Sequence, residues 1–110
     1  MEQQKWYQID FYVGLYDLEE LGDTYSFKES VDKVSELLGD CTIIPCVGSY
    51  QHSIGIRMNM NSLKVTKFIS SNPQSFAKEN ADRLKEIFKQ ESIITNITTC
   101  YELSFNKTYK

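Results

Sequence analysis

The chain has 110 residues, of which 41% are hydrophobic and 25% charged, and a net charge of −3. These values match globular averages, exclude a disordered chain and predict a single domain over residues 1–110. The basic residues are scattered among acids, which argues against nucleic acid as a partner, since phosphate binding needs a clustered basic surface. No run approaches the roughly 20 apolar residues of a membrane span, and no signal peptide pattern is visible. We therefore expect a cytoplasmic protein with no membrane contact.

The first predicted strand covers residues 5–16, where apolar residues recur at every second position, as in a strand with one buried face. An acidic connection, residues 17–23, leads to a capping box formed by Ser26 and Glu29, at which a helix should begin. Gly39 should end this helix, because glycine adopts the left-handed conformation at low cost. We expect the apolar side of the helix to carry Phe27, Val31, Val34, Leu37 and Leu38.

Residues 41–47 predict a second strand, and Pro45 within it indicates an edge position because proline cannot donate to the ladder. A hairpin turn is predicted at residues 48–51. Residues 54–60 then alternate between apolar and polar side chains, which predicts a third strand with one buried face. Residues 61–72 fit either an extension of this strand or a helical turn. The apolar face of the third strand would hold Ile54, Ile56, Met58 and Met60.

A second helix should begin at Asn72 and Pro73, an N-cap followed by a proline in the first turn. The last strand is predicted from Ile93 to about Phe105, which is roughly 40 Å at ~3.3 Å per residue and about twice the usual length. A long strand at a sheet edge invites pairing with another chain, so we expect a homo-oligomer.

The resulting order, βαββαβ, predicts an α+β fold of the ferredoxin-like type, with an antiparallel sheet and two helices on one face. In this topology the second strand lies at an edge, where Pro45 is tolerated. The first and last strands, which are predicted to be the longest, are neighbours.

Four residues have the right chemistry for a zinc site: Cys41, Cys46, His52 and Cys100. Their spacing includes no Cys-x₂-Cys pair, so we interpret the cysteines as small buried hydrophobes and predict neither a metal nor another cofactor. The single histidine is expected in or beside a turn. Nucleophilic catalysis would also need a nucleophile and an orienting group near it, and the sequence places neither there. We therefore predict no catalytic residue. The glycines are isolated and form no phosphate-binding loop.

The best candidate site is the polar face of the predicted sheet. Asp10 and Tyr12 project from the first strand on the face opposite its apolar residues, and Arg57 and Asn59 of the third strand are expected beside them. Glu102 of the last strand completes the candidate ligand-binding set. A face of this kind is either the solvent face of an open sheet or a binding surface.

Residues 88–94, where the second helix leads into the last strand, resemble the corresponding segment of a family of small bacterial proteins of unknown function. Residues 11–15 and the segment 48–50 fall in compatible places, although Tyr50 stands where the family pattern has a tryptophan. The resemblance implies the same ferredoxin-like order and no particular activity.

These observations favour a non-catalytic binding module that holds a small ligand or a protein partner, such as a host protein. A phage or mobile-element counter-defence protein, acting as a ligand sponge or an inhibitor, fits the small size and acidity. The alternative is a small dimeric enzyme with a pocket on the sheet face. The lack of a histidine-based or metal constellation favours binding over catalysis, and fold analogy cannot rank these functions.

Overall fold

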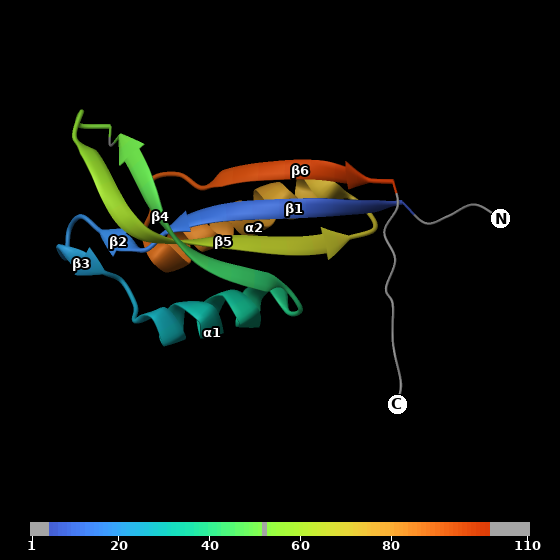
Figure 1. Ribbon diagram of the computed structural model, residues 1–110, viewed down its shortest axis with the longest axis horizontal. Helices are drawn as coiled ribbons and strands as arrows, with labels where there is room; N and C mark the ends of the chain where they lie inside the picture. The colour runs from blue at the N-terminus through green and yellow to red at the C-terminus, as the bar shows by residue number, and fades with distance from the viewer. Residues whose placement is uncertain (1–4, 52, 102–110) are drawn as a thin grey trace.

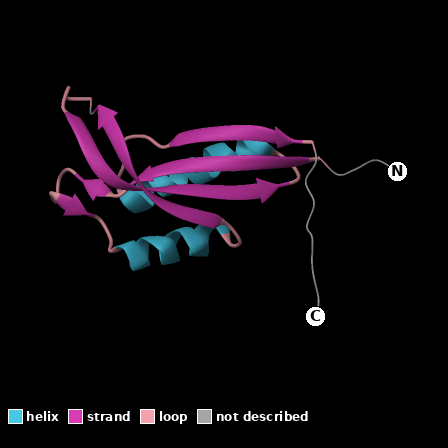
Figure 2. Cartoon of the chain, in the orientation of Figure 1, coloured by secondary structure: helices cyan, strands magenta, loops and turns pink. Residues whose placement is uncertain are grey.

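The computed structural model describes residues 5–51 and 53–101. Apart from a short additional hairpin, β2–β3, the described elements follow the predicted order βαββαβ (Figures 1 and 2). In chain order they are β1 (Trp6–Gly14), β2 (Tyr16–Asp17), β3 (Gly22–Asp23), α1 (Phe27–Leu38), β4 (Thr42–Gln51), β5 (Arg57–Ile69), α2 (Pro73–Phe88) and β6 (Ile94–Cys100).

The main sheet has the strand order β4-β5-β1-β6, and all its neighbouring strands are antiparallel. Both helices lie on the same face of this sheet (Figure 1). The predicted α+β fold of ferredoxin-like type is therefore confirmed. β4, which contains Pro45, lies at an edge, and β1 is a neighbour of β6, as expected. Neither helix among the described residues is long and apolar enough to cross a membrane.

The lengths of the strands differ from the prediction. The longest are β5, with 13 residues, and β4, with 10, because their hairpin continues beyond the end of β1. β6 ends at Cys100 after seven residues, and the predicted continuation through residues 102–105 lies outside the described residues. The homo-oligomer expected from a long edge strand stays a prediction. The ambiguous residues 61–72 extend the strand as far as Ile69.

The hairpin turn also lies later than predicted. Residues 48–51 belong to β4, and the chain reverses between Gln51 and Arg57, where Gly55 has a φ of 90°. Ile54 and Ile56 therefore lie in the turn and are 69% and 55% exposed, instead of lining a buried strand face.

Three of the four residues predicted to begin or end the helices do so in the structure. Ser26 Oγ accepts a hydrogen bond from the Glu29 amide at 3.1 Å, and Gly39 ends α1 with a φ of 69°. Pro73 is the first residue of α2. Asn72 departs from the prediction, because its left-handed backbone (φ 50°) leaves its side chain without a capping bond.

The core lies between the helices and the odd-numbered residues of β1 and β5. Phe11 and Phe88 are its largest fully buried side chains. Phe27, which was expected to be buried, is 53% exposed at the start of α1. The ring of Tyr25 instead packs edge-on against Phe88, with 5.7 Å between the ring centroids.

We expect Phe88→Ala to lower the free energy of unfolding by ~3–5 kcal/mol, because the substitution leaves a cavity in a packed core. Phe27→Ala is the matched control and should change it by less than ~0.5 kcal/mol, since this ring is largely in solvent. Urea denaturation measures both changes. Equal losses in the two variants would contradict this description of the core.

Candidate functional site

The face of the sheet opposite the helices, called here the open face, carries the even-numbered residues of β1. Asp10 lies at its centre, opposite Thr66 of β5 and Asn96 of β6. Thr66 Oγ1 donates to the Asp10 carboxylate at 2.7 Å, and Gln8 Nε2 lies 3.1 and 3.2 Å from its two oxygens. Asp10 is only 3% exposed, so its carboxylate is a satisfied internal group of the sheet rather than an accessible one.

The structure does not bring Arg57 and Asn59 to Asp10, and this expectation was wrong. The two residues pair with Gln51 and Ser49 of β4, in the part of the hairpin that extends beyond β1. It is a later part of β5, Ser62–Ile69, that pairs with β1, so that Thr66 lies opposite Asp10. Arg57 donates instead to Ser49 Oγ at 3.4 Å.

Glu102 lies outside the described residues. Tyr12 lies two residues beyond Asp10 on the open face, and the Lys64 ammonium is 5.8 Å from the centroid of its ring. The ligand-binding role assigned to the five candidate residues stays a prediction.

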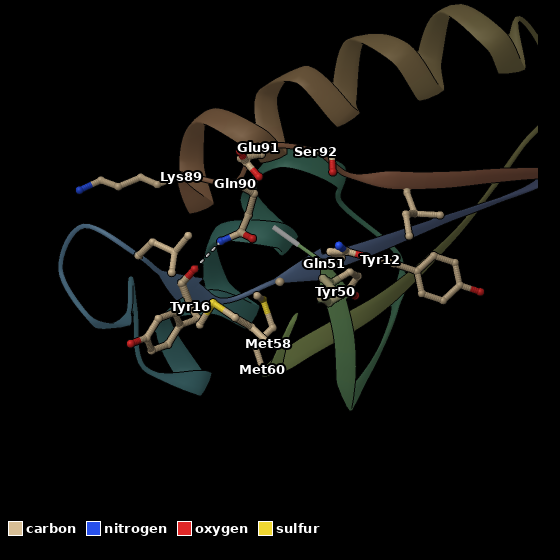
Figure 3. A pocket seen from close by; sticks show the side chains of 13 residues that line it. Tyr12, Tyr16, Tyr50, Gln51, Met58, Met60, Lys89, Gln90, Glu91 and Ser92 are labelled. Atoms are coloured by element: carbon tan, nitrogen blue, oxygen red, sulfur yellow. Dashed lines mark hydrogen bonds between the residues drawn. The ribbon is translucent and has the colours of Figure 1, made fainter. Parts of the chain in front are cut away.

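The β4–β5 hairpin bends away from the sheet near the end of β1 (Figure 1). A hollow of about 90 Å³ opens there, and Figure 3 shows the side chains that line it. Its lining comes from four places: the end of β1, the start of the β2–β3 hairpin, the two strands β4 and β5, and the segment between α2 and β6. Three tyrosines and two methionines dominate it. The lining residues are Tyr12, Gly14, Tyr16, Leu18, Tyr50, Gln51, Met58, Met60, Lys89, Gln90, Glu91, Ser92 and Ile94.

Two backbone features shape this hollow. Gly14 lies so close to its neighbours that a Cβ there would be 2.5 Å from Met60 Sδ and 2.8 Å from Gln90 Oε1. Glycine is therefore what allows both side chains to reach the end of β1. Lys89 ends α2 in the left-handed conformation (φ 53°), and this turn directs the following residues toward β1 and β2.

Gln90 joins the segment after α2 to the β2–β3 hairpin. Its side-chain nitrogen donates to the carbonyl of Tyr16 at 2.8 Å and to that of Phe88 at 3.0 Å. Its backbone amide donates to the Lys85 carbonyl at 3.0 Å. Three hydrogen bonds therefore hold this residue in place, and Figure 3 shows the one to Tyr16.

The charged residues at the hollow are engaged with partners outside it. Lys89 Nζ lies 3.7 Å from Asp17 Oδ2, and the Asp17 side chain is only 4% exposed. Figure 3 shows the Lys89 side chain extending away from Tyr50 and Gln51. Glu91 accepts a hydrogen bond from Ser53 Oγ at 2.6 Å, which ties the segment after α2 to the hairpin turn.

The three cysteines are free thiols at separate places. Burial raises the pKa of the Cys41 thiol, and nearby Lys67 partly offsets this effect. Cys46 is exposed, contrary to the expectation of burial, because it lies on edge strand β4 and faces away from the helices. Within residues 5–51 and 53–101, no three histidine, cysteine or acidic side chains form a group that could hold a metal ion. His52 lies outside the described residues.

Sequence reasoning found only Tyr12 among the residues of the hollow. It selected charged residues, whereas the lining is mainly aromatic, thioether and amide. One signal did point there: the three segments that carry the family resemblance, residues 11–15, 48–50 and 88–94, all contribute to the lining.

No family model and no curated protein matches the chain. Two solved structures are similar to it. A phage SAM lyase in complex with S-methyl-5'-thioadenosine has a TM-score of 0.71 and 22% identity, over 84% of this chain and 80% of that one. The GlnK–ATP complex of B. subtilis has a TM-score of 0.51 and 12% identity, over 91% of this chain and 85% of that one. At these identities the similarity shows the fold, and it supports the ferredoxin-like order rather than the bacterial family of the resemblance.

We expect Asp10→Ala to lower the free energy of unfolding by ~1–3 kcal/mol, because it removes the acceptor that Thr66 and Gln8 share. Arg57→Ala should change it by less than ~0.5 kcal/mol, since this side chain is exposed and makes a single long hydrogen bond. Thermal and urea denaturation measure both. A neutral Asp10→Ala would show that the carboxylate does not hold the sheet.

Proposed function

We propose that the chain binds an adenosine thioether or sulfonium, such as S-methyl-5'-thioadenosine or S-adenosylmethionine (SAM), in the hollow at the end of the open face. The observation that carries the proposal is that three tyrosines and two methionines line the hollow, namely Tyr12, Tyr16, Tyr50, Met58 and Met60. Aromatic rings offer a flat surface on which a purine can stack, and their faces attract a positive sulfonium. Methionine sulfur makes favourable contacts with ring edges.

The charges favour this ligand class over a nucleoside triphosphate. Lys89 is the only basic residue among the described ones that line the hollow, and Asp17 lies beside its ammonium. A triphosphate is held by several cationic or backbone donors, and the described lining has one cationic side chain, which already lies beside a carboxylate. The thioether of S-methyl-5'-thioadenosine is neutral and needs no cationic partner, and SAM has a single carboxylate in place of three phosphate groups.

The two similar structures support the same chemistry. One holds S-methyl-5'-thioadenosine and the other ATP, and an adenosine is common to both ligands. The more similar of the two carries the thioether. We therefore place the thioether and the sulfonium ahead of ATP.

Cleavage of SAM is the second candidate function, and the similarity to a lyase favours it. In such a reaction the bond between sulfur and Cγ breaks, and its electron pair stays on sulfur to give the neutral thioether. The carboxylate of the same molecule can attack Cγ and close a lactone, so the atoms balance without a protein nucleophile. This step fits the described lining, which includes neither cysteine nor histidine. It corresponds to the enzyme alternative expected from the sequence.

Calorimetric titration should show binding of SAM and S-methyl-5'-thioadenosine, with ATP at least about tenfold weaker. Tyr50→Ala should weaken binding about tenfold, the value of one aromatic contact. Tyr101→Ala, which removes a tyrosine that is 82% exposed, is the matched control and should have no effect. Equal losses in the two variants, or no binding of either adenosine ligand, would contradict the proposal.

Mass spectrometry of the same mixtures separates the two candidates. Recovery of intact SAM indicates binding alone, whereas release of S-methyl-5'-thioadenosine at a rate above that of the buffer indicates cleavage. Loss of this release in Tyr50→Ala, and its persistence in Tyr101→Ala, would assign the reaction to the hollow.

We extend the proposal to counter-defence, because sequestering or cleaving SAM lowers the supply of methyl donor in a host cell. Cells that express the chain should contain less free SAM than cells that express Tyr50→Ala. A restriction system that requires SAM should then restrict unmodified phage less efficiently, which plating efficiency measures. Equal plating efficiency on the two strains would contradict the counter-defence role but not the proposal that the chain binds the ligand.

A further inference from the structure

We propose that Gln90 selects the base of the ligand, its side-chain oxygen accepting a hydrogen bond from the 6-amino group of an adenine ring in the hollow. This inference rests on the proposed function and adds to it the residue that distinguishes a 6-aminopurine from a 6-oxopurine.

The orientation of the Gln90 carboxamide is determined by its surroundings. A carboxamide nitrogen has two donors, and here it lies 2.8 Å from the Tyr16 carbonyl oxygen and 3.0 Å from that of Phe88. A flipped carboxamide would place its oxygen against these two acceptors and lose both bonds. The Phe88 carbonyl would keep only the Thr24 hydroxyl, which donates to it at 3.3 Å. The nitrogen therefore stays on the side of Tyr16, and the oxygen stays on the other.

This arrangement makes Oε1 a fixed acceptor inside the hollow. The position of Gln90 is set by its backbone bond to Lys85 at the end of α2, in addition to the two side-chain bonds. Oε1 lies over the backbone of Gly14, next to Met60 Sδ, in space that a side chain at Gly14 would fill. Figure 3 shows the carboxamide above Tyr16, Met58 and Met60, with its nitrogen turned toward Tyr16. None of the hydrogen bonds among the described residues has Oε1 as its acceptor.

A fixed acceptor discriminates by the direction of the hydrogen bond. The 6-amino group of adenine donates to it, whereas the 6-oxo group of hypoxanthine presents a second acceptor. Repulsion between the two acceptors, and the loss of the bond, should weaken a 6-oxo ligand by about 10- to 100-fold. The thioether and aromatic surfaces around Oε1 suit a flat base better than a ribose, whose hydroxyl groups each need polar partners.

The experiment compares S-methyl-5'-thioadenosine with its 6-oxo analogue, S-methyl-5'-thioinosine, by calorimetric titration. The unmodified protein should prefer the amino ligand by about 10- to 100-fold. Gln90→Met keeps the length of the side chain but removes the acceptor, so the amino and oxo ligands should bind this variant with about equal affinity. Gln74→Met makes the same exchange at an exposed position of α2 and should keep the full preference.

A ligand without the donor tests the same bond on the unmodified protein, in case Gln90→Met does not fold. The 6-dimethylamino analogue should bind as weakly as the 6-oxo ligand. Equal affinity for the amino and oxo ligands, or an unchanged preference in Gln90→Met, overturns the inference. The inference is also overturned if a 2',3'-dideoxy ligand fails to bind while the dimethylamino ligand binds normally. That result would place Oε1 against the ribose instead of the base. Absence of binding by every ligand removes the proposed function itself.

Discussion

The rest of the structure depends on the register between β1 and β5, in which Asp10 lies opposite Thr66 and Gly14 opposite Ser62. Because strand side chains alternate between faces, a slip by one residue would turn Asp10 into the core and Phe11 out of it. The short hydrogen bond from Thr66 to Asp10 favours the observed register, because it satisfies a buried carboxylate. The same register ends the pairing of β1 at Gly14. Beyond the bond from the Leu15 amide to the Asn61 carbonyl, the described part of β5 pairs only with β4, and the bend of this two-stranded hairpin leaves the hollow at its base.

Local patterns predicted the elements well wherever the physical cause is itself local. Alternation along β1, the capping bond at Ser26 and the left-handed Gly39 need only neighbours in the sequence. Pro45 likewise indicates an edge by a property of its own backbone. The predicted position of the hairpin turn was wrong because Gly48 was interpreted as a turn residue. The ring of Tyr50 lies against its backbone and occupies the space of a side chain, so this glycine marks a close approach within a strand and not a turn.

The site was harder to predict, because the hollow is assembled from segments that meet only when the fold is complete. Selecting candidates by charge led away from the hollow for a physical reason. Buried or constrained charges need partners, and here they have them: Asp10 bonds to Thr66 and Gln8, and Lys89 lies beside Asp17. These interactions hold the sheet and fix the segment after α2. The lining that remains accessible is mainly neutral, and neutral residues carry a weak signal in a single sequence.

A neutral hollow has few means of recognising a ligand, and this limits what the protein can distinguish. Stacking on tyrosine and contact with methionine sulfur accept any flat ring of suitable size. Selectivity must then come from groups whose hydrogen-bonding direction is fixed before the ligand arrives. Gln90 meets this requirement because the carbonyls of Tyr16 and Phe88 occupy its two donors, so the bonds that hold the β2–β3 hairpin against the end of α2 also set the polarity of the hollow. If the proposed binding holds, packing of the fold and recognition of the base depend on the same carboxamide, and a substitution there should affect both.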